Sequence, residues 1–252
     1  MARSVVLAGT ERCDRCRLPP RWCICDGIAP VACPLQVDLL MHPREQWRPT
    51  STGKLIERVV PGSRIHPYTR GVPPDQATLV AQGRELWILH PRGEPVAGLM
   101  AATPPPNPSG IQVLLLDGSW RESGDMLRHV ERWGRTVHLP LSGPSRYALR
   151  EQQGDGRHST VEALLGLLGA LGLFDIETQL RLHFELHVYV TLRARGKKEH
   201  AEAYLAESPV REALPELLIR LNERRPNPSL PRLPPSVHPS RDSTLGSDQP
   251  GP

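Results

Sequence analysis

Four short apolar runs lie along the middle of the chain, and each is followed by a polar or amphipathic stretch. The runs predict β-strands at residues 35–41, 85–89, 111–116 and 135–139. Apolar positions with helical spacing between and after them predict helices at residues 53–60, 120–133, 159–173 and 177–207. Alternating strands and helices are typical of an α/β fold, in which helices cover both faces of a parallel or mixed sheet.

Changes in composition divide the chain into four parts. These are a cysteine-rich module at residues 1–33, a main domain at 34–207, a C-terminal helix at 208–224 and a tail at 225–252. Proline is abundant, at 28 of 252 residues, and the tail combines it with serine and aspartate, so we expect the tail to be disordered. No apolar run approaches the ~18 residues of a membrane span, and the N-terminus lacks a signal-peptide core. We therefore expect a soluble, cytoplasmic protein.

Four of the five cysteines occur close together, in the pattern C-x2-C-x6-C-x-C formed by Cys13, Cys16, Cys23 and Cys25. Without a secretion signal, such a pattern indicates a metal site before disulfides. Thiolates suit tetrahedral Zn²⁺, so we predict a zinc module with these four ligands, although its C-x-C half is tighter than a usual zinc knuckle. The alternative is a reduced loop that binds no metal. Cys33, which precedes a proline, is expected to be a small buried residue.

The chain is mildly basic, with a formal net charge of +4 and a sequence pI of about 9.0. This charge is compatible with a nucleic-acid partner but does not establish one. Two groups of basic residues are candidates for contacts with a phosphate backbone, or are simply solvated surface: Arg193, Arg195, Lys197 and Lys198, and the module's Arg12, Arg15, Arg17 and Arg21.

Polar and aromatic residues follow three of the predicted strands. In open α/β sheets, ligands bind beyond the carboxyl ends of the strands, where this chain places His42-Pro43, His90-Pro91 and Asp117-Gly118-Ser119-Trp120. The two histidines are candidates for a site or, alternatively, structural residues. Ser119 and Glu122 have the spacing of a helix capping box. Trp120 is either a core aromatic or a ring that covers a bound cation.

Six short motifs occur in an order that resembles the DTW-domain family, over about residues 13–205. They are the cysteine pattern, MHPRE at 41–45, TSTG at 50–53, LLLDGSW at 114–120, YALR at 147–150 and HSTVEAL at 158–164. The chain departs from the family pattern at Ser119, where threonine is usual, and at Ser51, where asparagine is frequent. The first of these changes keeps the hydroxyl group.

The resemblance implies a specific activity and fold. It implies a tRNA-uridine aminocarboxypropyltransferase, which moves the 3-amino-3-carboxypropyl group of S-adenosylmethionine to uridine N3 and releases methylthioadenosine. The implied fold is similar to the SPOUT class, with a knotted backbone at the cofactor pocket. The implied catalytic residues are Asp117, Ser119 and Trp120. The implied cofactor-binding residues are Thr52, Asp117, Trp120, Leu139, Tyr147, Ser159, Thr160, Glu162 and Ala163.

The chemistry of these side chains suggests individual roles. Asp117 is a candidate proton acceptor for N3 or an electrostatic partner of the sulfonium. The hydroxyls of Thr52, Ser159 and Thr160 suit the amino and carboxylate ends of the cofactor, and Leu139 suits the adenine. Glu162 binds an amine or, alternatively, is a first-turn acid favoured by the helix dipole.

Two other classes of function remain open at this point. One is a SAM-dependent RNA methyltransferase on a related fold, which would turn the methyl carbon toward the substrate. The other is a non-catalytic, zinc-containing RNA-binding protein, which would not bind S-adenosylmethionine. The sequence does not identify the tRNA, the uridine position or the oligomeric state.

Overall fold

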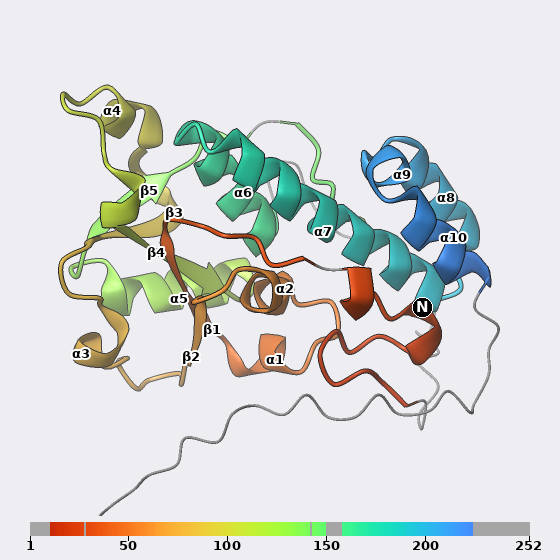
Figure 1. Ribbon diagram of the computed structural model, residues 1–252. Helices are drawn as coiled ribbons and strands as arrows, with labels where there is room; N and C mark the ends of the chain where they lie inside the picture. Colours follow the sequence, from red (N-terminus) through yellow and green to blue (C-terminus); the bar gives the residue numbers. More distant parts are fainter. Residues whose placement is uncertain (1–10, 28, 142, 150–157, 224–252) are drawn as a thin grey trace, which may run out of the picture.

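A computed structural model of the protein describes residues 11–27, 29–141, 143–149 and 158–223. At its centre is a five-stranded sheet in the order β2-β1-β4-β3-β5, with parallel pairing throughout (Figure 1). The strands are β1 (Gln36–Met41), β2 (Arg64–Pro67), β3 (Glu85–Pro95), β4 (Ile111–Asp117) and β5 (Arg135–His138). The predicted α/β class is therefore confirmed, and all five strands end at the same edge of the sheet.

The longer helices of the main domain are α2 (Thr52–Val59), α5 (Trp120–Val130), α6 (Thr160–Ala170) and α7 (Phe174–Ala194). Short helices connect them: η1 (Pro20–Trp22), η2 (Cys25–Gly27), α1 (Pro43–Gln46), α3 (Gln76–Leu79), α4 (Val96–Met100) and η3 (Pro108–Gly110). The C-terminal part consists of α8 (Lys198–Ala206), α9 (Val210–Ala213) and α10 (Pro215–Glu223). The tail predicted at 225–252 lies outside the described residues.

Apolar side chains bury both faces of the sheet. Along β4, Val113 and Leu115 belong to one core and Leu114 to another, because successive strand residues point to opposite faces. The first core includes side chains of α2, α6 and α7, and the second includes side chains of α3 and α5. Helices therefore cover both faces of the sheet, as the alternating pattern predicts.

Four elements differ from the predictions. The single C-terminal helix predicted at 208–224 is two helices, α9 and α10. The strand predicted at 85–89 continues to Pro95 after a register shift in its pairing with β5. The helical stretch predicted at 177–207 is two helices, because Gly196 has a φ of 75° and ends the first. The edge strand β2 is not predicted, since its side chains are exposed or half-buried and show no apolar alternation.

A buried acid explains why β2 pairs with β1. Asp38 of β1 has no exposed surface, and its carboxylate accepts hydrogen bonds from three side chains. The donor–acceptor distances are 2.9 Å to Arg64, 2.8 Å to His66 and 2.7 Å to Gln112. Burial alone would raise the pKa of Asp38, but these partners outweigh it and lower the pKa. β2 therefore supplies two of the groups that an acid inside the sheet requires.

The cysteine-rich module packs directly against the main domain. Its residues Leu18, Trp22 and Ile24 are buried in the same core as α2 and α7. The Arg193 guanidinium of α7 lies 4.7 Å from the ring centroid of Trp22, a cation–π contact that joins the two parts. Figure 1 shows η1 beside the C-terminal half of α7.

Within the described residues, no helix combines the length and the apolar character that crossing a lipid bilayer requires.

Candidate functional site

A cavity of about 400 Å³ opens at the carboxyl ends of β3, β4 and β5, next to the first turns of α2, α5 and α6. Its lining includes eight of the ten residues implied by the motifs: Thr52, Asp117, Ser119, Trp120, Leu139, Ser159, Thr160 and Ala163. These residues come from segments more than a hundred positions apart in the chain. The fold thus brings most of the predicted site together at one place.

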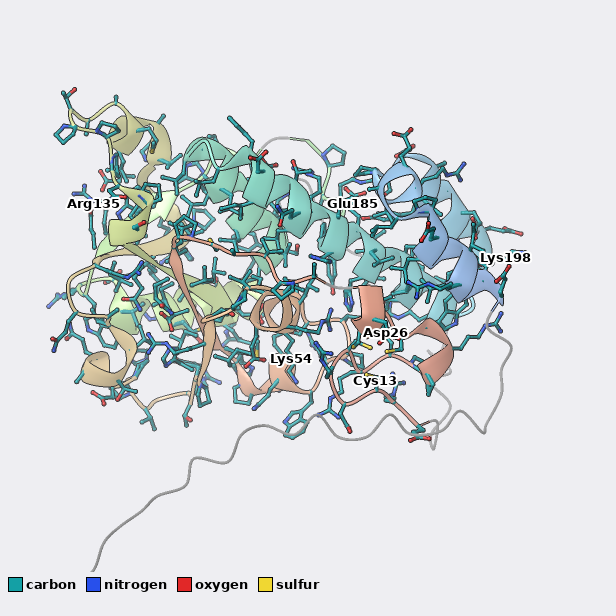
Figure 2. All side chains as sticks on the ribbon, in the orientation of Figure 1. Cys13, Asp26, Lys54, Arg135, Glu185 and Lys198 are labelled. Atoms are coloured by element: carbon teal, nitrogen blue, oxygen red, sulfur yellow. The ribbon has the colours of Figure 1, made fainter. Side chains whose placement is uncertain are left out.

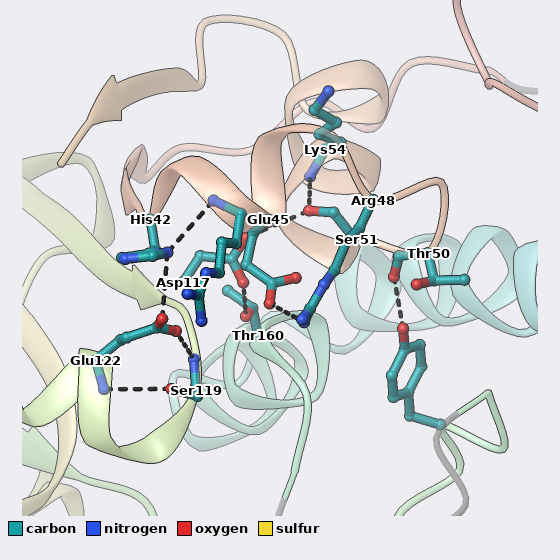
Figure 3. Close-up of polar contacts among 12 residues, drawn as sticks. His42, Glu45, Arg48, Thr50, Ser51, Lys54, Asp117, Ser119, Glu122 and Thr160 are labelled. Carbon is teal, nitrogen blue, oxygen red and sulfur yellow. Dashed lines mark hydrogen bonds and ion pairs between the residues drawn. The ribbon is translucent and has the colours of Figure 1, made fainter. Parts of the chain in front are cut away.

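Asp117, the last residue of β4, lies at the polar end of the cavity and is 3% exposed. Its carboxylate accepts hydrogen bonds from the hydroxyls of Thr160, at 2.5 Å, and Ser51, at 3.3 Å. Figure 3 shows the Thr160 contact at the start of α6. Gly53 passes so close that a Cβ atom there would lie 2.4 Å from an Asp117 carboxylate oxygen. Asp117 therefore holds the first turns of α2 and α6 together.

Three helices begin at the cavity, and each begins with a serine cap. The Ser51, Ser119 and Ser159 hydroxyls accept backbone N–H bonds at the starts of α2, α5 and α6. The capping box predicted for Ser119 and Glu122 is present, and Ser159 and Glu162 form a second one (Figure 3 draws the first). Helix N-termini carry partial positive charge, so this end of the cavity favours an anionic group.

Trp120 is the first residue of α5 and is 46% exposed at the cavity. The interpretation of Trp120 as a core aromatic is thus wrong, because nearly half of its surface faces solvent. The lining also includes the apolar side chains of Leu89, Val137 and Leu141. The cavity consequently combines a carboxylate, an accessible indole and an apolar surface.

Two residues implied by the motifs lie outside this lining. Tyr147 is buried, donates its hydroxyl proton to the Thr50 carbonyl at 2.5 Å and stacks on Phe184. Glu162 accepts hydrogen bonds from the backbone N–H groups of Ser159, at 2.6 Å, and Arg146, at 2.7 Å. Both side chains brace the segments that surround the cavity, and neither is placed on its surface.

The cavity also contains three histidines that the motif comparison does not assign: His90, His138 and His158. The Nδ1 atom of His90 accepts the Arg92 backbone N–H at 3.2 Å, and burial lowers the pKa of His90, with a smaller effect from Arg92. A neutral His90 ring therefore carries its proton on Nε2. In the sequence His90 directly follows the strand predicted at 85–89, which was the available signal, although in the structure it lies within β3. His42 instead approaches Glu122, at 3.3 Å, outside the lining.

The four clustered cysteines form a second site. The sulfur atoms of Cys13, Cys16, Cys23 and Cys25 all lie within 4.8 Å of one another, and Figure 2 shows sulfur gathered beside Cys13. The sulfurs of Cys13 and Cys25 are 3.6 Å apart, and those of Cys16 and Cys23 are 3.7 Å apart. A tetrahedron with Zn–S bonds of ~2.3 Å has S···S edges of about 3.8 Å. All four are free thiols, so these residues fit a zinc ion.

The protonation of the cysteine cluster is strongly perturbed. Hydrogen bonds from Cys23 and Cys25 lower the pKa of Cys16 to about 3, while the same cluster raises the pKa of Cys25. Cys33 lies outside the cluster and is half-buried rather than buried as predicted, and partial burial raises its pKa. The cluster therefore favours thiolate at one sulfur even before a metal is considered.

Several basic residues proposed for phosphate contacts are engaged within the protein. Arg193 forms an ion pair with Glu202 and lies over Trp22, and Arg195 donates a hydrogen bond to the Leu149 carbonyl at 3.0 Å. In the module, Arg12 donates to the Arg17 carbonyl at 2.9 Å. These contacts reduce the freedom of both basic groups to follow a phosphate backbone.

A parallel α/β sheet with a cavity at its carboxyl edge, together with a four-cysteine module, defines an α/β protein with a candidate small-molecule site and a candidate metal centre. The sequence matches the DTW domain over residues 10–192. The chain belongs to the DTW-domain family, which is associated with tRNA-modifying enzymes. No solved structure gives a significant match to the chain.

Proposed function

We propose that this protein is a tRNA-uridine aminocarboxypropyltransferase that uses S-adenosylmethionine. The observation that carries the proposal is the convergence of Asp117, Trp120 and three helix N-termini on one cavity with an apolar wall. S-Adenosylmethionine combines a cation, a carboxylate and an aromatic base, and each has a matching surface in this cavity. The cavity volume of about 400 Å³ is within the usual range for sites that bind small molecules.

The hydroxyls and helix N-termini support one orientation of the cofactor. Thr52, Ser159 and Thr160 would bind the amino acid end, because backbone N–H groups and hydroxyls there favour a carboxylate. The apolar wall with Leu139 and Ala163 would hold the adenine. When bound, S-adenosylmethionine supplies an electrophilic γ-carbon and a sulfonium that leaves as a neutral thioether.

Asp117 and Trp120 would stabilise the cation, and the proton that uridine N3 loses would pass to solvent water rather than to Asp117. The Thr160 and Ser51 hydroxyls donate to Asp117, and hydrogen bonds of this kind stabilise the ionised carboxylate. An ionised acid and an indole face both attract a sulfonium. The main contribution of the protein would then be orientation, which places the γ-carbon in line with uridine N3.

The proposal also covers the metal, the partner, the location and the backbone topology that the family resemblance implies. It includes a zinc ion at the four cysteines, tRNA as partner, a cytoplasmic location and a SPOUT-like, knotted backbone. The strand order β2-β1-β4-β3-β5 and the closeness of α6 to α2 support a SPOUT-like arrangement. A crystal structure with S-adenosylmethionine, traced through residues 150–157, tests the knot.

The transfer itself is tested with two labelled cofactors. The purified protein is incubated with bulk tRNA and S-adenosylmethionine that carries the label either in the carboxyl group or in the methyl group. We expect carboxyl label, and no methyl label, in the RNA. Methyl label alone would indicate a methyltransferase. The absence of both labels, with no heat of S-adenosylmethionine binding by calorimetry, would indicate a non-catalytic RNA-binding protein.

A further inference from the structure

Arg58 is a half-buried arginine, and two of its three guanidinium nitrogens are buried without a hydrogen-bond partner in the described residues. It lies in the last turn of α2, and its Nε and Nη2 atoms have essentially no exposed surface. Within the described part of the chain, neither atom has a hydrogen-bond acceptor, and no carboxylate forms an ion pair with Arg58. An enclosed charge without compensation is strongly unfavourable, and arginine does not relieve it by losing its proton.

The groups around Arg58 show where the compensating charge lies. Burial lowers the pKa of Arg58, whereas Cys16, Cys25 and Cys13, in that order, raise it by electrostatic attraction. On the side of α7, Arg58 acts on His183 and His187, whose pKa values burial lowers, so both are neutral near pH 7. The cysteine cluster is therefore the anionic neighbour of this guanidinium.

We infer that Arg58 is the internal counter-ion of a zinc–tetrathiolate centre formed by the four clustered cysteines. Four thiolates around one Zn²⁺ leave two uncompensated negative charges, since a coordinated thiol loses its proton. A positive charge held beside such a centre stabilises the loaded form. The same contact gives the enclosed guanidinium the anion that the rest of the described structure does not provide.

The position of Arg58 also connects the zinc centre with the cavity. α2 has eight residues, with Arg58 in its last turn and Ser51 and Thr52 at its start. The backbone N–H of Val31, near the end of the module, donates to the Val59 carbonyl at the end of α2, at 2.7 Å. Loss of zinc would reduce the negative charge that faces Arg58 and so destabilise the helix that reaches Asp117. The effect on cofactor binding rests on the proposed function, whereas the role of Arg58 toward zinc does not.

The counter-ion role is tested by measuring zinc affinity in the full-length protein by competition with a chromophoric chelator. We compare wild type with Arg58→Met, Arg58→Lys and, as a matched control, Arg15→Met, because Arg15 is an exposed arginine in the same module. Loss of a group that supports a metal centre typically weakens metal binding about 10- to 100-fold, which is the loss that we expect for Arg58→Met. Arg58→Lys should lie closer to wild type, and Arg15→Met should stay within about twofold of it.

Either of two results would overturn the inference. One is wild-type zinc affinity in Arg58→Met. The other is an equal loss in Arg58→Lys and Arg58→Met, which would assign the effect to packing rather than charge. If Arg58→Met does not fold, Arg58→Lys is compared with Arg58→Gln instead. Because lysine keeps the positive charge, the inference requires Arg58→Lys to bind zinc more tightly than Arg58→Gln.

The connection through α2 is tested by amide hydrogen exchange of the wild-type protein, with and without a zinc chelator and in the absence of S-adenosylmethionine. We expect faster exchange at residues 52–59 after zinc removal, and unchanged exchange there would overturn the connection. Because no cofactor is present, this result is independent of whether the proposed transferase activity is correct.

Discussion

The two chemical centres of this protein place negative charge inside the fold in different ways. At the cysteine cluster, the charge would lie on sulfur, and its proposed partners are a metal ion that can dissociate and the guanidinium of Arg58. At the cavity, the acidic group is Asp117, and its partners are hydroxyls at helix N-termini fixed by the backbone. Under the proposals above, only the first centre depends on a component that can leave the protein.

This difference separates stability from ligand binding. A centre that needs zinc adds the free energy of metal binding to the free energy of folding, so metal removal should affect the whole module. A centre made of fixed dipoles is organised before its ligand arrives and should tolerate the absence of that ligand. The predictions below test this separation, from the largest expected effect to the smallest.

Replacing one cysteine should have the largest effect. Cys16 is the most buried of the four, and Cys16→Ser removes a soft ligand that serine does not replace. We expect loss of stoichiometric zinc and a large fall in the melting temperature, measured by metal analysis and calorimetry. Cys33→Ser is the matched control, because Cys33 lies outside the cluster. A zinc-bound, thermally unchanged Cys16→Ser protein would contradict the assignment of the metal ligands.

Replacing the acid at the cavity should remove activity and leave the fold intact. Asp117→Asn keeps the shape of the side chain but removes its charge. We expect a fall in transfer rate of about 10²- to 10³-fold, the usual cost of losing one preorganised electrostatic group. Zinc content should remain that of wild type. Wild-type activity in this variant would place the reacting centre elsewhere.

A methyl group at Gly53 should disturb the cavity more than the stability. The added Cβ would lie 2.4 Å from the Asp117 carboxylate, so α2 and the acid have to move apart. We expect Gly53→Ala to cost about 1–3 kcal/mol of stability and to weaken S-adenosylmethionine binding in calorimetry. Gly98→Ala, where the Cβ meets nothing within 4 Å, is the control. Equal behaviour of the two variants would show that the close approach is unimportant.

The smallest effect at neutral pH is that of His187, and it grows only as the pH falls. Burial holds the pKa of this fully buried histidine at about 3, below its ordinary value of 6.5. The unfolded chain therefore binds the proton first, and stability falls as the pH decreases from about 6.5 toward 3. We expect His187→Phe to reduce this loss in the free energy of unfolding by up to about 1.4 kcal/mol per pH unit. The measurement is urea unfolding at a series of pH values with excess zinc. The exposed His200, changed to Phe, should have no such effect.

Much of the fold could be predicted because its strands are apolar on both faces. The limits of β1 and β4 agree with the predicted runs to within one residue at each end. The strand β2 could not be predicted, because it depends on Arg64 and His66 pairing with Asp38, which is a contact between distant parts of the chain. Local pattern carries no information about such a partner.

The site was predictable to the extent that strand ends and helix caps mark it. Ser119 and Ser159 are capping residues by sequence and lie in the cavity by structure. Tyr147 and Glu162 show the limit of this reasoning, because a motif position does not reveal whether a side chain faces a cavity or braces its wall. From the sequence, His90 could be identified only as a polar residue directly after the strand predicted at 85–89.

The two hydrogen bonds of Asp117 have a consequence for the order in which the protein forms. They join residues that are 66 and 43 positions apart, so each requires the closure of a long chain segment. During synthesis, β1, α2 and β4 leave the ribosome well before α6, and the pocket remains open until Thr160 arrives. Competence to bind a small molecule would therefore be acquired late, after most of the sheet has already assembled.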